Sequence, residues 1–112
     1  MAFNALLDMT DTNIGKITLV GELDASVAPV FREQIEKVVA AKATKLVLML
    51  SGLSYMSSAG LRTLIFAKQK MGVNTDVFIV GAQPSILETL EMTGFDKSVI
   101  LLSEYDAIQI GG

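Results

Sequence analysis

The chain has 112 residues, a net charge of −3 at pH 7, and neither cysteine nor histidine. These absences exclude disulfides, thiolate nucleophiles, histidine-ligated metal ions and a Ser-His-Asp triad. No basic stripe and no glycine-rich phosphate loop of known type occurs, which argues against nucleic-acid and nucleotide ligands.

The hydropathy pattern favours a buried sheet over a membrane segment. Hydrophobic residues make up 51% of the chain, but its longest unbroken apolar run is Leu46–Leu50. A membrane-spanning helix needs roughly 20 such residues. The first residues show no secretory signal pattern, so we expect one cytoplasmic domain, residues 1–112, without a membrane partner.

Two strands joined by a turn are expected first. The pattern predicts strands at Ala5–Met9 and Lys16–Leu23 around a turn-rich Thr10–Gly15. Because the connection is short, the two strands should be antiparallel. A helix capped by Asp24 or Ser26 should follow. Its apolar residues recur at helical spacing: Val27, Phe31, Ile35 and Val38.

Three strand–helix pairs complete the chain. Buried strands are predicted at Leu46–Leu50 and Val77–Val80, and a last strand at Val99–Leu102. The helices after them are predicted at Ala59–Met71, from Pro84 to a stop at Gly94, and at Glu104–Ile110. Helical crossovers make successive strands parallel. The sequence therefore predicts an α/β fold: a mixed, mostly parallel sheet with an antiparallel first strand, packed with about four helices.

The loops that follow the parallel strands should meet at one edge of this sheet. These loops are Gly21–Asp24, Ser57–Gly60 and Gly81–Pro84. In the second loop, Ser58 lies where a buried strand gives way to a helix N-terminus, whose free N–H groups and dipole favour a phosphate. A helix-capping role for Ser58 is the structural alternative, and the two roles are compatible.

Two segments carry a resemblance that covers nearly the whole chain. The first segment precedes the first helix and reads Gly21-Glu22-Leu23-Asp24. The second segment precedes and opens the second helix and reads Leu50-Ser51-Gly52-Leu53-Ser54-Tyr55-Met56-Ser57-Ser58-Ala59-Gly60-Leu61. With both segments at this separation and in this order of strands and helices, the chain resembles the STAS domain family. The resemblance is strongest to the small single-domain anti-sigma factor antagonists, and it implies the STAS fold.

The resemblance implies a partner-switching protein that is not an enzyme and needs no cofactor. In its unphosphorylated form, such a protein binds an anti-sigma factor, often also a serine kinase, and so frees a sigma factor. Phosphorylation breaks the complex, and a serine phosphatase restores it. By position, Ser58 corresponds to the family's phosphoacceptor and Asp24 to the acidic residue beside it. The chain has Ser57 where Asp is common and Ala59 where Ser or Thr is common.

A docking surface for the kinase is expected around Ser58. Its expected residues are Asp24, Ser57, Ala59, Gly60, Arg62 and Phe66. At about 100° per residue, one apolar arc of the second helix contains Leu61, Leu64, Ile65, Ala67 and Met71, which places Arg62 and Phe66 outward. For Gly60 we favour a close approach of helix to strand, because Gly costs about 1 kcal/mol relative to Ala in a helix.

Two other functions remain open. The first is a STAS scaffold or ligand-binding module in another signalling complex, whose serine is never phosphorylated. The second is an enzyme such as a Ser-Lys hydrolase, which would need a desolvated lysine beside the serine. No lysine lies in the three converging loops, which argues against the enzyme.

Overall fold

The computed structural model describes residues 3–111. The strands are β1 (Asn4–Asp11), β2 (Ile14–Leu23), β3 (Lys45–Met56), β4 (Asp76–Val80) and β5 (Ile100–Leu102). The helices are α1 (Ala28–Ala40), α2 (Ser58–Met71), α3 (Pro84–Thr93) and α4 (Ala107–Gly111), with a short 3-10 helix, η1 (Phe95–Ser98), after α3. All predicted strands and α-helices are present in the predicted order, and η1 is the one element that the pattern did not predict.

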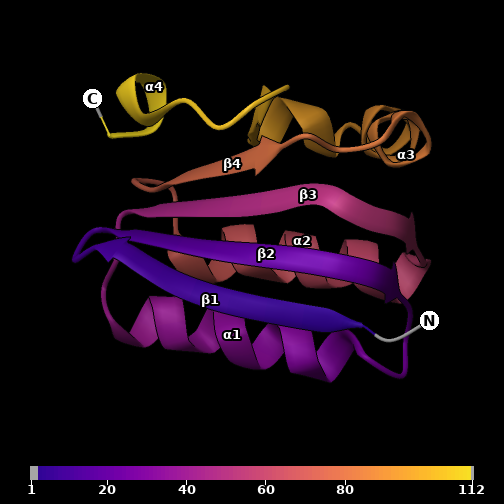
Figure 1. The fold of residues 1–112 in the computed structure, drawn as a ribbon, viewed down its shortest axis with the longest axis horizontal. Coiled ribbons are helices and arrows are strands. Elements are labelled where there is room, and N and C mark those ends of the chain that lie inside the picture. The colour runs from indigo at the N-terminus through magenta and orange to yellow at the C-terminus, as the bar shows by residue number, and fades with distance from the viewer. Residues whose placement is uncertain (1–2, 112) are drawn as a thin grey trace.

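The strands form one sheet in the order β1-β2-β3-β4-β5. β1 is antiparallel to β2, and all other neighbouring strands are parallel. Figure 1 shows β1 to β4 side by side in this order, with α3 and α4 towards opposite ends of β4. The predicted mixed sheet with an antiparallel first strand is therefore confirmed. Among residues 3–111, no helix is long and apolar enough to cross a membrane.

The main core lies between one face of the sheet and helices α1, α2 and α3. Its largest fully buried side chains include Ile17, Leu19, Leu23, Phe31, Ile35, Leu46, Leu48, Leu50, Leu53, Leu64, Ile79 and Leu90. Because side chains alternate along a strand, Val47 and Phe78 point to the other face. There they form a smaller cluster with Val80 and with Ile110 of α4.

The strands extend beyond their apolar runs. β1 and β2 leave only Thr12 and Asn13 between them, so most of the predicted turn is strand. β3 continues past Leu50 to Met56 through a stretch that contains serine and glycine. Its last residues pair with β2, where Met56 lies opposite Leu23. The backbone ladder, rather than an apolar pattern, therefore holds the end of β3.

The start of α1 differs from the prediction. The helix begins at Ala28, and its N-cap Val27 makes no side-chain capping hydrogen bond. Asp24 and Ser26 hydrogen-bond to each other instead: one Asp24 carboxylate oxygen accepts from the Ser26 N–H at 2.9 Å and from its hydroxyl at 2.6 Å. The carbonyl of Asp24 accepts from the N–H of Ala28 at 3.0 Å. Capping by either side chain was therefore wrong, because a turn separates them from the helix.

Gly60 lies in the first turn of α2 against the ends of β2 and β3. A Cβ built on Gly60 would lie 2.8 Å from Cγ of Leu23 and 2.9 Å from Cγ of Met56. Both neighbours are buried. The expected close approach of helix to strand is confirmed, and it explains why the smallest residue stands here.

Gly60→Ala should lower the free energy of unfolding by about 1 kcal/mol. Overpacking typically costs about 1–3 kcal/mol, which exceeds the roughly 1 kcal/mol that Ala gains in helix propensity. Gly111→Ala is the matched control, because a Cβ there meets nothing within 4 Å. It should change stability by less than about 0.5 kcal/mol in urea unfolding. Equal stability of the Gly60 variant and the wild type would show that the contact is loose.

Candidate functional site

The turn between β3 and α2 is bonded to the end of β2. The N–H of Ser57 donates to the carbonyl of Leu23 at 2.8 Å. Asp24 is the next residue after Leu23, and Ser58 is the next residue after Ser57. The bond therefore brings the loop after β2 and the start of α2 together, as the sheet topology predicted.

Two further hydrogen bonds join the first and third of these converging loops to β3. The hydroxyl of Ser54 donates to the carbonyl of Gly21 at 3.1 Å. The side-chain amide of Gln83, in the loop after β4, donates to the carbonyl of Ser51 at 3.2 Å. All three predicted loops thus lie along the same edge, although the third contacts β3 rather than Ser58.

Ser57, rather than Ser58, caps α2. Its backbone is extended (φ −79°, ψ 174°), and its hydroxyl oxygen accepts from the N–H of Gly60 at 3.3 Å. The N–H of Leu61 donates to the Ser57 carbonyl at 2.9 Å. The capping alternative for Ser58 is therefore wrong, because its neighbour already fills that position.

Ser58 is the first residue of α2 and is exposed. Its hydroxyl makes no hydrogen bond with the described residues 3–111. The first turn of α2 contains no acidic residue. The helix N-terminus, with its unpaired N–H groups and positive dipole end, favours a negative charge at this position. The hydroxyl is accessible, and a phosphate on it would lie in a favourable field.

Asp24 carries a negative charge on the loop that the Ser57–Leu23 hydrogen bond joins to the start of α2. The hydrogen bond from the Ser26 hydroxyl, together with the N–H groups of Ser26 and Val27, lowers the pKa of Asp24 below its usual value of 3.8. Asp24 is therefore ionised at neutral pH. Its charge opposes a second negative charge on Ser58 and attracts a cationic group of a partner.

The buried face of α2 is rotated relative to the predicted arc. Its buried residues are Gly60, Thr63, Leu64, Ala67 and Met71. Leu61 and Ile65 are only half-buried at one margin. The prediction missed the rotation because it counted large apolar side chains, whereas Gly60 and Thr63 occupy the face closest to the sheet.

Phe66 is not exposed as predicted. It is half-buried at the other margin of α2, packed against the main core. The guanidinium of Arg32 on α1 covers its ring, with Cζ 4.0 Å from the ring centroid. Arg62 is exposed as predicted, and Ala59 is half-buried. Phe66 therefore contributes to the packing of α2 against α1, and sequence reasoning missed Arg32 because this contact crosses between two helices.

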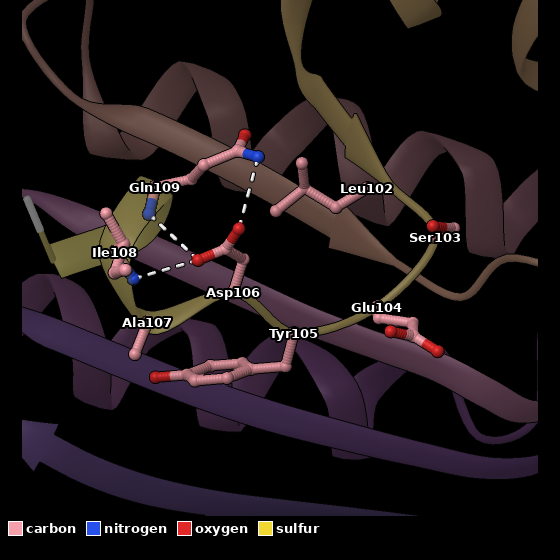
Figure 2. A pocket seen from close by; sticks show the side chains of 8 residues that line it. All are labelled: Leu102, Ser103, Glu104, Tyr105, Asp106, Ala107, Ile108 and Gln109. Carbon is pink, nitrogen blue, oxygen red and sulfur yellow. Dashed lines mark hydrogen bonds between the residues drawn. The ribbon is translucent and has the colours of Figure 1, made fainter.

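A hollow over the C-terminal segment is lined by neither Asp24 nor Ser58. Its lining consists of consecutive residues, Leu102 to Gln109 (Figure 2). The carboxylate of Asp106 is occupied there, because it accepts from the N–H groups of Ile108 at 2.9 Å and Gln109 at 3.3 Å. This cap also explains why α4 begins at Ala107 and not at the predicted Glu104. The Asp106 carboxylate is therefore engaged within the fold.

Metal chemistry has no support in the described part of the chain. Residues 3–111 contain no group of three or more carboxylate, histidine or cysteine side chains that could hold a metal ion.

The chain belongs to the STAS domain family, whose model matches residues 8–107. Anti-sigma-F factor antagonist RsfB of Mycobacterium tuberculosis is 29% identical over 96 residues, which cover 85% of this chain and 79% of that protein.

Solved structures share the fold. An anti-sigma factor antagonist from Mycobacterium paratuberculosis superposes with a TM-score of 0.89 at 26% identity, covering 99% of this chain and 96% of that one. The Bacillus cell fate determinant SpoIIAA in its phosphorylated form gives a TM-score of 0.75 at 22% identity, covering 96% of this chain and 97% of that one. At that identity, the second likeness concerns the fold alone.

The two adjacent serines should differ in their effect on stability. Ser57→Ala removes the cap of α2 and should lower the free energy of unfolding by about 1 kcal/mol. Ser58→Ala, its matched control, removes an exposed hydroxyl and should stay within about 0.5 kcal/mol of wild type. Urea midpoints of the two variants measure this difference. A larger loss for Ser58→Ala than for Ser57→Ala would contradict the assignment of the cap.

Proposed function

We propose that this protein is an anti-sigma factor antagonist that switches partners when Ser58 is phosphorylated. Its family and the names of its relatives support the class of function. The observation that carries the proposal is the Ser58 hydroxyl, which is exposed and unbonded at the start of α2 while Ser57 supplies the cap.

The proposed cycle takes place in the cytoplasm and needs no cofactor of this protein's own. The unphosphorylated form binds an anti-sigma factor and frees a sigma factor. The anti-sigma factor is also a serine kinase: the Ser58 oxygen attacks the γ-phosphorus of ATP, the bond to ADP breaks, and the kinase takes the hydroxyl proton. A serine phosphatase then transfers the phosphoryl group to water. The protein serves as acceptor and binding module rather than as an enzyme.

Phosphorylation would act through charge rather than through refolding. A phosphate adds about −1.5 to −2 charges at neutral pH. The N-terminus of α2 stabilises this charge in the free protein, whereas Asp24 opposes it. A packed interface would also have to desolvate the phosphate, which is costly without a new cationic partner. Dissociation therefore needs no change of fold.

The proposed partner surface surrounds Ser58. Asp24, Ser57, Ala59 and Arg62 would contact the kinase directly, since each lies within one helical turn of Ser58 or beside its loop. Gly60 is buried, so it supports this surface by letting α2 approach the sheet.

Ser58→Asp should weaken binding to the source organism's anti-sigma factors at least tenfold, or about 1.4 kcal/mol. The added carboxylate imitates part of the phosphate charge at the same position. Ser85→Asp is the matched control: it places the same charge at an exposed position in the first turn of another helix, α3, outside the proposed partner surface. Its affinity should stay within about threefold of wild type. Both can be measured by calorimetry with the purified anti-sigma factors.

An unchanged affinity of the Ser58→Asp variant would contradict the switch. It would favour the alternative, a STAS scaffold or ligand-binding module whose serine is not phosphorylated. The Ser58→Ala variant should bind the anti-sigma factor like wild type but should not be phosphorylated. It therefore distinguishes loss of the phosphoacceptor from a failure to fold.

A further inference from the structure

Charge is distributed unevenly along this acidic chain. Seven of its nine basic residues lie between Ala28 and Met71, together with only two of its twelve acidic residues. Helix α2 contains Arg62, Lys68 and Lys70 and no acidic residue. The helix that begins at Ser58 is therefore basic in a protein whose net charge is −3.

Two cations lie over one half-buried ring, and a third lies one turn away on the same helix. Arg32 of α1 covers Phe66 at 4.0 Å, and Nζ of Lys70 lies 5.8 Å from the ring centroid. Arg62 precedes Phe66 by four residues and Lys70 follows it by four, so the three form one stripe along α2. We call the surface made by Arg32, Arg62, Phe66 and Lys70 the α1–α2 face.

The cations of this face have no carboxylate partner in the described chain. Within residues 3–111, the ion pair within 4.0 Å joins Lys37 to Glu33. Glu36 borders a hollow with Lys70 but forms no ion pair with it. Lys68, by contrast, donates to the carbonyl of Thr75 at 2.7 Å and is thus engaged within the protein. Mutual repulsion of the unpaired cations disfavours the free protein, and an anionic partner would offset it.

We propose that the α1–α2 face binds an acidic segment of the anti-sigma factor, whose carboxylates pair with Arg62 and Lys70 and whose apolar side chain contacts the part of Phe66 that stays exposed. This inference rests on the proposed function and adds the chemistry of the partner. Complementary charge speeds association and suppresses wrong partners. Aromatic and Arg side chains together are typical energetic centres of interfaces.

A protein segment fits this face better than a nucleic acid does. The face offers few cations, and α1 interleaves Glu33 and Glu36 with them. The remaining chain, outside Ala28–Met71, contains ten acidic and two basic residues and repels an extended polyanion.

The α1–α2 face also connects to the switch. Arg62 follows Ser58 by four residues, the spacing at which side chains on a helix are neighbours. A phosphate on Ser58 attracts the Arg62 guanidinium through charge-assisted hydrogen bonds. The phosphate then competes with the partner's carboxylates for the same cation.

A fluorescein-labelled peptide of alternating glutamate and leucine tests the charge preference directly. It should bind the wild-type protein at low salt and more weakly at about 0.15 M salt. Arg62→Gln/Lys70→Gln should reduce its affinity about fivefold or more. The control, Lys16→Gln/Lys97→Gln, removes the same charge elsewhere and should leave affinity unchanged. Binding is followed by fluorescence anisotropy, and urea midpoints verify that both variants fold.

The inference would be overturned if the wild-type protein does not bind the peptide, or if Arg62→Gln/Lys70→Gln binds it as tightly as wild type does. It would also be overturned if a single-stranded oligonucleotide of equal charge binds more tightly than the peptide. The same variants with the anti-sigma factor separate the two proposals. If Ser58→Asp releases that factor but Arg62→Gln/Lys70→Gln binds it normally, the switch stands and the α1–α2 face is wrong. If the double variant loses the factor and Ser58→Asp does not, the face stands and the switch is wrong.

Discussion

The hydrogen bond from the Ser57 N–H to the Leu23 carbonyl, 2.8 Å long, is the contact on which the functional edge depends. It continues the pairing of β2 with β3 to the last residue of each strand and fixes where α2 begins. Asp24 and Ser58 lie one residue beyond it on either side. Gly60 then allows α2 to pack directly on Leu23, so the position of the exposed hydroxyl follows from the sheet itself.

The two serines at this turn divide structural and chemical roles. Ser57 satisfies the N–H of Gly60 and holds the first turn of α2. Ser58 is thereby relieved of any capping role and stays free on the surface. A phosphate at Ser58 would therefore add charge without removing a bond that the fold requires. This separation is why a local electrostatic switch, rather than a conformational one, fits the geometry.

The sequence was sufficient to predict the fold class, because short apolar runs alternating with helical periodicity leave few topologies. The sequence was not sufficient where a residue's surroundings are formed by residues far away along the chain. The polar end of β3 is a strand because β2 continues beside it, and Phe66 is half-buried because it packs against the main core and under Arg32 of α1. Either Ser57 or Ser58 was a chemically suitable cap, and only the backbone at the end of β3 decides between them.

Mapping of the phosphorylated residue by tandem mass spectrometry tests the central claim most directly. The protein is incubated with its anti-sigma factor kinase and ATP, beside the Ser58→Ala and Ser57→Ala variants. The account predicts phosphate on Ser58 in the wild type and in Ser57→Ala, and none in Ser58→Ala. Phosphate found chiefly on Ser57, or undiminished in Ser58→Ala, would contradict it.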